Sequence, residues 1–447
     1  MKINNFVDGP TGCFGDSKES LMYQAKAMPD LDFFASRISF ADYATSSATF
    51  CISVFDACNL DCSYCFNREK KNSAVNMDEV FSFLESCFKI FPNKEKYYVD
   101  LSGKGEPLLY LDKILKIKEY CVRKQNELNV EVLVQFVCNG TMLNIGVANV
   151  LQSHGILFGV SIDGNREIHD LQRRTKTGEP TFDTIVSNVK AIPHHEYVGA
   201  AATLTSSTYS LSDSLKKLGE VFNTVSYKPS RNCDQAINQN SINDWCARYD
   251  ELSDFLLDSS VNGDIRYLKT IINGDDYFGK FIKRVFLGTK VVNRCDGGLS
   301  RLALDSNGAV YPCPSSFPFE ELRLGTPYCL NTNKMSELFE KQLSNKECLS
   351  CDVRHLCGGE CMVERLLSNG NNKFMCQYKR HLIHLSIEFY LTLRSANSVV
   401  FDKVKSFCKE VCRRSKRDDN LYRFLKDHPS LSFSEAKKLF DEQSKRY

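Results

Sequence analysis

Short apolar runs alternate with longer segments of helical periodicity between residues 50 and 228. The apolar runs have strand length and predict buried strands at 50–55, 97–101, 130–137, 157–162, 198–204 and 224–227. The segments between them predict helices near 78–90, 112–126, 142–153, 181–191 and 210–220. Such alternation is typical of parallel βαβ units, whose right-handed crossovers curl the sheet toward a barrel. We therefore predict an α/β fold with an open, partial (β/α)6 barrel.

The whole chain divides into five parts by pattern. We predict an N-terminal extension at 1–48, the barrel at 49–228, bridging helices at 229–294, a cysteine-rich domain at 295–377 and a helical tail at 378–447. Within the bridging part, helical patterns cover 245–257, 265–272 and 277–287. In the tail, Ser432 is expected to cap a helix over 433–445. The basic stretch 403–417 fits a solvated helix face, and docking of an acidic peptide segment is the alternative.

Charge and cysteine content narrow the class of protein. The 447 residues carry a net charge of +2, which gives no support to nucleic-acid binding. The N-terminus has no apolar signal region, and no run of 18 apolar residues predicts a membrane span. Twenty cysteines in a chain of this kind indicate reduced thiols that largely bind metal, and hence a cytoplasmic protein.

Three cysteines lie in one short loop directly after the first predicted strand. Cys58, Cys62 and Cys65 stand at positions i, i+4 and i+7, and Tyr64 precedes the third of them. Three thiolates on a four-iron cluster leave one iron without a protein ligand, and an open metal position permits chemistry. A structural zinc site is the alternative, but zinc needs a fourth ligand and the first histidine of the chain is His169.

Polar and glycine-containing loops follow the next three predicted strands. Residues 103–107, which include Gly105, Glu106 and Pro107, follow the second strand. Asn139 follows the third strand, and Ser161 closes the fourth. The carboxyl ends of parallel strands lie at one rim, so we expect these loops to meet the cysteine loop there. Glycine permits close backbone approach to a ligand, but Leu at position 108 excludes a dinucleotide-binding glycine pattern.

The cysteine loop with its aromatic resembles the signature of radical S-adenosylmethionine (radical SAM) enzymes, and the resemblance covers residues 50–228. Gly103-Lys-Gly-Glu-Pro is similar to the family's Gly-Gly-Glu-Pro element, whose backbone binds the amino group of the methionine moiety, with Lys104 in place of a glycine. Ser161 and Arg173 match a serine that contacts the ribose and an arginine that contacts the carboxylate of SAM. A surface ion pair is the alternative for Arg173. Asn139 is either a turn residue or a cofactor contact.

The resemblance implies a mechanism and a set of partners. The open iron would chelate the amine and carboxylate of SAM, and the reduced cluster would release methionine and a 5′-deoxyadenosyl radical from it. The protein would aim the radical and exclude water. A flavodoxin or ferredoxin-type protein would supply the electron.

A second group of cysteines lies in the C-terminal third. Seven cysteines, together with Gly308, resemble the SPASM extension of radical SAM enzymes in order and spacing: Cys295, Cys313, Cys348, Cys351, Cys357, Cys361 and Cys376. The resemblance implies two auxiliary 4Fe-4S clusters, one on Cys348, Cys351, Cys357 and Cys376 and one on Cys295, Cys313 and Cys361, and so three clusters in the chain. Cys329 could complete the second, or an iron could stay open. Two structural zinc sites are the alternative. The ten other cysteines are expected to be buried small hydrophobes.

Enzymes with both features mostly modify peptides. We therefore expect a maturase that installs a cross-link or oxidation in a ribosomally made peptide, with an auxiliary cluster taking the surplus electron. A sulfatase-maturase-like oxidation is an alternative, which Pro314 disfavours because those maturases carry an aspartate base at that position. A small-molecule dehydrogenase and an iron–sulfur redox sensor are the others, although a sensor needs no Ser161–Arg173 clamp for SAM. The pattern selects neither the attacked residue nor the catalytic base.

Overall fold

The computed structural model describes residues 13–16, 21–24, 47–67 and 74–427, except 194, 232, 234, 275, 290, 292–293, 344 and 368–372. The predicted capped helix at 433–445, and most of the predicted extension at 1–48, lie outside the described residues. Within that extension, β1 (Cys13–Asp16) and β2 (Leu21–Gln24) form a two-stranded antiparallel sheet of their own.

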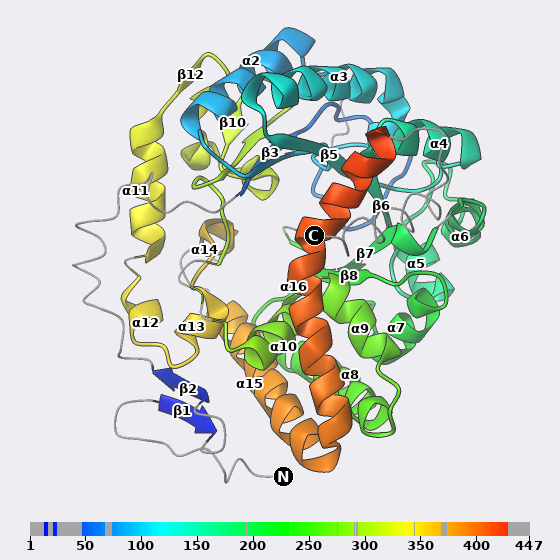
Figure 1. The fold of residues 1–447 in the computed structure, drawn as a ribbon, viewed down its shortest axis with the longest axis vertical. Helices are drawn as coiled ribbons and strands as arrows, with labels where there is room; N and C mark the ends of the chain where they lie inside the picture. The colour runs from blue at the N-terminus through cyan, green and yellow to red at the C-terminus, as the bar shows by residue number, and fades with distance from the viewer. Residues whose placement is uncertain are drawn as a thin grey trace.

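Six parallel strands form the core of the molecule, as the apolar runs predict. They are β3 (Ser47–Ile52), β4 (Lys96–Asp100), β5 (Glu131–Cys138), β6 (Ile156–Ser161), β7 (Gly199–Leu204) and β8 (Val225–Pro229). Each strand pairs in parallel with the next one along the chain, as in Phe50 opposite Val99. The sheet curves, and its helices lie along the outside of the curve (Figure 1). The prediction of an α/β partial barrel is confirmed.

The predicted helices between these strands also form. They are α2 (Met77–Ile90), α3 (Leu111–Leu128), α4 (Ile145–Ser153), α6 (Phe182–Lys190) and α7 (Leu211–Gly219). Asn76, Asn144 and Ser210 cap α2, α4 and α7 by accepting a hydrogen bond from a backbone N–H of the first turn. A short helix that the pattern does not predict, α5 (Arg166–Gln172), lies between β6 and α6.

The cysteine-rich part continues the same sheet. β9 (Arg301–Leu304) pairs in parallel with β3, with Cys51 opposite Ala303. β10 (Val310–Tyr311), β11 (Gly325–Thr326) and β12 (Cys329–Leu330) follow in antiparallel order. The result is a ten-stranded sheet in the order β12-β11-β10-β9-β3-β4-β5-β6-β7-β8. The barrel and the cysteine-rich part are therefore joined by main-chain hydrogen bonds at the strand that carries the cysteine loop.

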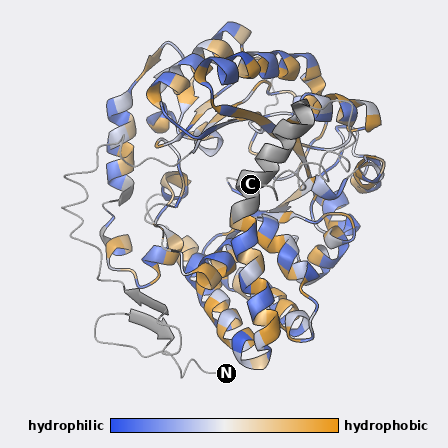
Figure 2. Ribbon diagram, in the orientation of Figure 1, coloured by the Kyte–Doolittle hydropathy of each residue, from blue (hydrophilic) through white to orange (hydrophobic). Residues whose placement is uncertain are grey.

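The bridging helices pack with the two long C-terminal helices, and most of this group lies in the lower half of Figure 1. The bridging helices are α8 (Ile242–Val261), α9 (Arg266–Gly274) and α10 (Tyr277–Leu287), and they pack with α15 (Lys373–Ala396) and α16 (Ser398–Asp427). Trp245, Tyr249 and Tyr378 are fully buried among them. Figure 2 shows that these helices carry both hydrophobic and hydrophilic residues, as helices with one packed face do. Among the described residues, no helix has both the length and the apolar character that crossing a membrane requires.

Candidate active site at the carboxyl ends of β3, β4, β5 and β6

The loop that carries Cys58, Cys62 and Cys65 leaves the carboxyl end of β3, and all three side chains are partly exposed. Main-chain hydrogen bonds hold the loop against the segment after α5. The N–H of Asp61 donates to the carbonyl of Arg174 at 2.8 Å, and that of Ser63 donates to the carbonyl of Gln172 at 2.9 Å. The backbone therefore fixes the three cysteines beside the segment that contains Arg173.

Tyr64 of this loop forms a polar group with the buried side chains of Asp163 and Arg173. The Tyr64 hydroxyl donates to Asp163 Oδ2 at 2.5 Å and accepts a hydrogen bond from Arg173 Nη1. Asp163 Oδ1 accepts from the N–H of Thr203 at 2.7 Å, and the Arg173 guanidinium lies 3.9 Å from the Asp163 carboxylate. Arg173 is only 7% exposed, so the expected alternative of a surface ion pair is wrong for this residue.

One atom of Arg173 lacks a hydrogen-bond partner. Its Nε is buried and has none among the described residues. A buried donor left unsatisfied costs about 1–3 kcal/mol, so a partner from outside the chain is favoured there. Burial works against the charge, but the Cys62 thiol, Tyr64 and Asp163 raise the pKa of Arg173 well above its ordinary value. The site therefore presents a permanent cation with a free donor beside the three cysteines, which suits a carboxylate.

A neutral histidine positions Arg173. Burial, and then the charge of Arg173, lower the pKa of His169 to about 2. His169 Nδ1 accepts from the N–H of Asp163 at 3.1 Å, so the proton of the ring is on Nε2. That nitrogen lies 3.0 Å from Thr181 Oγ1, which donates at 2.7 Å to the carbonyl of Arg173. Asp163, His169 and Thr181 were not among the residues predicted from the sequence, although Asp163 stands within the Ser161–Gly164 segment.

Glu106 ties two of the rim loops together. Its side chain is 2% exposed, and its two oxygens accept from the N–H of Leu108 at 3.0 Å and that of Asn139 at 2.6 Å. Burial raises the pKa of Glu106 to about 7, while the two backbone donors and the charge of Arg173 act against the shift. Next to it, Gly105 has φ +71°, and a Cβ there would lie 2.5 Å from the carbonyl of Ala57. Pro107 begins a 3-10 helix, Pro107–Tyr110.

Asn139 has the turn role that was one of its two expected roles. Its Oδ1 accepts from the N–H of Thr141 at 3.0 Å and from the Thr141 hydroxyl at 2.7 Å. Its Nδ2 donates to Asn59 Oδ1 at 2.7 Å and lies 3.9 Å from Cys58 Sγ. The side chain thus also touches the first cysteine of the loop. Ser161 is the last residue of β6, in register with Ala201 of β7.

Lys104 links the barrel to the cysteine-rich part. Its Nζ lies 2.7 Å from Asp305 Oδ1 and 4.0 Å from Asp56 Oδ1. Ser306 donates to the same oxygen of Asp56 at 2.7 Å. All of these side chains are largely buried. The residue that departs from the Gly-Gly-Glu-Pro pattern therefore makes an ion pair across the junction of the two parts.

The seven cysteines of the C-terminal part fall into two sets by their mutual effects. Burial, then Cys361 and Cys295, raise the pKa of Cys313 to about 11. Burial, then Cys376 and Cys357, raise the pKa of Cys348 to about 11, and burial and Cys357 also raise that of Cys351. We call Cys295, Cys313 and Cys361 the three-thiol set, and Cys348, Cys351, Cys357 and Cys376 the four-thiol set. These names follow the grouping that the SPASM resemblance implies.

The donors fit iron–sulfur chemistry. Both sets, and the loop after β3, offer thiols, which as thiolates are the ligands of 4Fe-4S clusters. Among the described residues, no group of three or more Cys, His, Asp or Glu side chains has the arrangement of a single-ion site. The assignment of cysteines to clusters stays a prediction that rests on the donor type and on the grouping.

The ten cysteines outside these two sets and the loop after β3 are not all buried. Cys51, Cys87, Cys121, Cys138, Cys246 and Cys408 are buried, as expected. Cys233 is partly exposed, and Cys329 and Cys412 are exposed, so the expectation of burial is wrong for these three. Cys329 lies on β12, the outermost strand of the sheet. Cys13 lies among residues whose side chains are not described.

Comparison with known proteins gives a consistent picture. A model of the Radical SAM superfamily matches residues 52–200. The cysteine-type anaerobic sulfatase-maturating enzyme of Clostridium perfringens is 25% identical over 337 residues, which are 68% of this chain and 85% of that protein. The serine-type anaerobic sulfatase-maturating enzyme of Bacteroides thetaiotaomicron is 23% identical over 368 residues, 73% of this chain and 86% of that protein.

A solved structure agrees in fold. Native anSMEcpe with bound AdoMet superposes with a TM-score of 0.62 at 22% identity, over 78% of this chain and 99% of that one. The domain that the family model matches contains the cysteine loop, Tyr64, Asp163 and Arg173. Residues 52–200 therefore form a radical SAM domain, and the chain is similar over most of its length to the anaerobic sulfatase-maturating enzymes.

Proposed function

We propose that this radical SAM enzyme modifies a ribosomally made peptide, either by cross-linking two of its residues or by oxidising a side chain. The observation that carries the proposal is the buried, unsatisfied Nε of Arg173 beside the loop of Cys58, Cys62 and Cys65. A cation held by Tyr64 and Asp163 at a thiol-lined rim fits the carboxylate of SAM next to an iron–sulfur cluster.

Different residues of the rim would bind the cluster and the different parts of SAM. Cys58, Cys62 and Cys65 would hold the SAM-binding cluster, and Arg173 would bind the carboxylate of SAM. Ser161 would contact the ribose. The backbone at Gly105, Glu106 and Pro107 would contact the amino group, with the carboxylate of Glu106 holding that backbone in place. When bound and reduced, the cluster supplies the electron that cleaves SAM to methionine and a 5′-deoxyadenosyl radical.

Relatives support a peptide substrate. The curated relatives are named sulfatase-maturating enzymes. The structure of native anSMEcpe with bound AdoMet and Cp18Cys peptide superposes on this chain with a TM-score of 0.62. For a cross-link, the substrate loses two hydrogens: one goes as an atom to the 5′-deoxyadenosyl radical, and the other leaves as a proton and an electron. We propose that the two cysteine sets hold auxiliary clusters that take this electron. We further propose that a flavodoxin or ferredoxin-type protein donates the electron that reduces the SAM-binding cluster. We also propose that the enzyme is cytoplasmic.

Oxidation of the sulfatase-maturase kind is the second candidate, because this chain aligns with more than 80% of the length of the curated relatives with that name. Cys313 is followed by Pro314, which begins a short 3-10 helix, Pro314–Ser316. Proline offers no carboxylate to accept a proton. The second candidate therefore needs a base from another part of the chain.

The test is coexpression of the enzyme with a short peptide encoded beside its gene, followed by mass spectrometry of the peptide. Loss of two hydrogens with linked fragment ions supports a cross-link, and conversion of cysteine or serine to an aldehyde supports the second candidate. Arg173→Met, with iron content intact, should abolish the product. An unmodified peptide, although the purified enzyme forms 5′-deoxyadenosine, would contradict a peptide substrate and favour a small molecule.

A further inference from the structure

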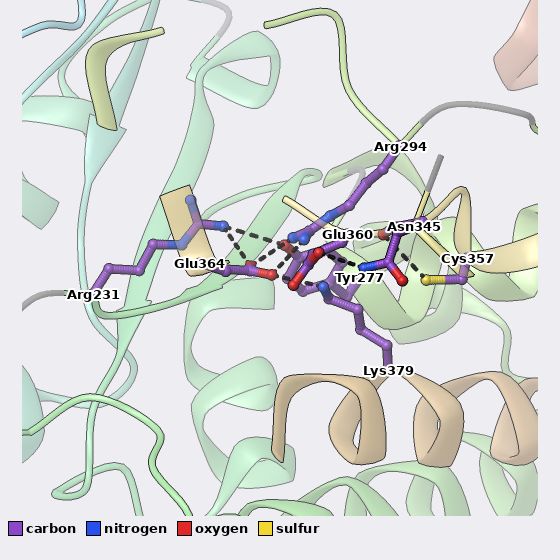
Figure 3. Close-up of polar contacts among 9 residues, drawn as sticks. Arg231, Tyr277, Arg294, Asn345, Cys357, Glu360, Glu364 and Lys379 are labelled. Atoms are coloured by element: carbon purple, nitrogen blue, oxygen red, sulfur yellow. Dashed lines mark hydrogen bonds and ion pairs between the residues drawn. The ribbon is translucent and has the colours of Figure 1, made fainter. Parts of the chain in front are cut away.

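Glu364 is a buried carboxylate that meets three cations (Figure 3). Its oxygens lie 2.5 Å and 2.8 Å from the guanidinium of Arg294, 2.7 Å from Lys379 Nζ and 3.3 Å from Arg231 Nη2. The exposed fraction of the side chain is 4% for Glu364, 3% for Lys379, 9% for Arg294 and 34% for Arg231. We call these four residues the Glu364 ion-pair network.

The network is attached to the segments that carry the two cysteine sets. Arg294 directly precedes Cys295. Glu364 lies on α14 (Met362–Leu367), one helical turn after Cys361. Lys379 lies on α15, one helical turn after Cys376. Arg231 follows β8, and so comes from the carboxyl rim of the barrel.

The two oxygens of the Glu364 carboxylate separate the cations. Oε2 accepts from Lys379 Nζ, and Lys379 lies one helical turn after Cys376 of the four-thiol set. Oε1 lies 3.3 Å from Arg231 Nη2 and 2.8 Å from Arg294 Nη2, and Arg294 directly precedes Cys295 of the three-thiol set. Arg294 Nη1 contacts Oε2, so its guanidinium spans both oxygens. The network is therefore joined to segments of both sets.

Three cations around one carboxylate leave positive charge in a buried place. Buried charge is unfavourable unless it is compensated, and breaking such a network costs several kcal/mol. Glu360 lies close by but has partners of its own, since Asn345 Nδ2 donates to it at 2.7 Å and Arg365 lies 3.6 Å away. Thiolate-ligated iron–sulfur clusters are anionic, and net charge is one determinant of their reduction potential. Anionic centres on the two sets would compensate the network.

We propose that the Glu364 ion-pair network sets the reduction potentials of two auxiliary clusters, with Lys379 acting on the four-thiol set, Arg231 on the three-thiol set and Arg294 on both. The inference rests on the proposed function, because it needs those clusters. Reduction adds one electron to a cluster, so a nearby cation stabilises the reduced form and raises the potential. The cations thus make the auxiliary clusters better acceptors for the electron that leaves the substrate. The residues tune the clusters and do not touch the reacting atoms.

The test is a redox titration of the anaerobically reconstituted full chain, followed by EPR. The signal that changes on addition of SAM identifies the SAM-binding cluster, which serves as an internal reference. Lys379→Met should lower the midpoint potential of one auxiliary signal, and Arg231→Gln should lower that of the other. Arg294→Met should lower both midpoint potentials. Lys379→Arg should leave both midpoint potentials unchanged, because the positive charge is kept. Glu364→Gln should move both midpoints upward.

Two control variants separate charge from packing. Tyr277→Phe removes the hydroxyl that lies 3.2 Å from Arg231 Nη2 but keeps the ring under Arg294, so it should move no midpoint. Lys217→Met removes a charge from the exposed side of α7 and should have no effect either. Arg231 is partly exposed, so Arg231→Gln should fold even where the buried variants fail, and its result decides whether the network acts on the clusters.

Unchanged auxiliary midpoints in Arg231→Gln, with the full iron content, would overturn the role of the network. Equal shifts of both signals in Lys379→Met and in Arg231→Gln would overturn the division between the sets. Absence of auxiliary EPR signals from the unmodified protein, with no iron bound to the two sets, would instead contradict the proposed function. The two failures are thus distinguishable.

Discussion

The Tyr64 hydroxyl donates a hydrogen bond of 2.5 Å to Asp163 Oδ2 and thereby joins the cysteine loop after β3 to the carboxyl end of β6. These residues are 99 positions apart in the chain. The same hydroxyl accepts from Arg173, so one phenol holds the carboxylate and the guanidinium in fixed positions. The loop that would carry the cluster and the arginine that would bind SAM are therefore joined by this side chain as well as by the main-chain hydrogen bonds of Asp61 and Ser63.

Tyr64→Phe should weaken SAM binding while the iron content stays constant. The variant removes a hydrogen bond to a charged group, which contributes about 1.5–3 kcal/mol, so affinity should fall roughly tenfold to a hundredfold. Anaerobic calorimetry with SAM measures the change. Tyr209→Phe, whose residue is 72% exposed, is the matched control and should bind SAM as the unmodified chain does. Equal affinities for the two variants would remove Tyr64 from the site.

The pattern of the sequence accounts for the barrel but not for the sheet beyond it. The six parallel strands and the helices between them are long enough to show their periodicity. α5 has seven residues, and β9 to β12 have two to four each, which is too short for a periodic signal. The parallel pairing of β9 with β3 also joins segments some 250 residues apart, which no local pattern can indicate.

The same division holds for the site. Tyr64 and Arg173 could be predicted to meet, because both follow from a family-like spacing and from the shared rim of parallel strands. The support given by His169 and Thr181 could not, since a histidine within a helical segment has no distinctive spacing. In the sequence, the charges of Glu364 and Lys379 cannot be told from those of solvated helix positions. Their burial depends on how α14 and α15 pack.

Stability should fall as the pH drops below about 6.5, in part because of His169. Burial and Arg173 lower its pKa to about 2 in the folded state, so the unfolded chain binds a proton that the folded chain does not bind. Its contribution to stability is complete above pH 6.5 and decreases by about 1.4 kcal/mol per pH unit below that value. Urea unfolding at pH 7.0 and pH 5.5 measures the slope. His169→Asn should reduce this slope by up to about 1.4 kcal/mol per pH unit, which corresponds to one proton. An unchanged slope would mean that the imidazole is protonated in the folded state.

Glu106→Gln should destabilise the rim by about 1–3 kcal/mol. The carboxylate accepts from the N–H of Leu108 and that of Asn139, and a glutamine amide can replace only one of these acceptors. Thermal unfolding followed by circular dichroism checks the magnitude. Glu220→Gln, on the exposed surface, should leave the melting temperature nearly unchanged. A loss no larger than that of this control would contradict the bridging role of Glu106.

Lys104→Met should cost about 3 kcal/mol of stability, because it leaves Asp305 buried without its cation. Asp305→Asn should be less damaging in the Lys104→Met background than alone, and a double-mutant cycle gives the coupling energy. Urea unfolding of the four proteins supplies the data. Strict additivity of the two changes would mean that the ion pair does not join the barrel to the cysteine-rich part.

Iron content distinguishes the cysteine sets from the exposed cysteine. The unmodified chain should bind about twelve iron atoms, as three 4Fe-4S clusters require. Cys313→Ala should lose up to one cluster, whereas Cys329→Ala should lose none, because Cys329 is exposed on the edge strand β12. Anaerobic metal analysis provides both numbers. Loss of iron from Cys329→Ala would assign this residue to the three-thiol set.

The most direct test of the central claim compares the unmodified chain with the triple variant Cys58→Ala, Cys62→Ala, Cys65→Ala under anaerobic reduction. The unmodified chain should show one iron–sulfur EPR signal that changes on addition of SAM, and should release 5′-deoxyadenosine. The triple variant should lose that signal and that product and keep the auxiliary signals. Zinc in place of iron in the unmodified chain, or 5′-deoxyadenosine from the triple variant, would contradict the claim that these three cysteines hold the cluster that binds SAM.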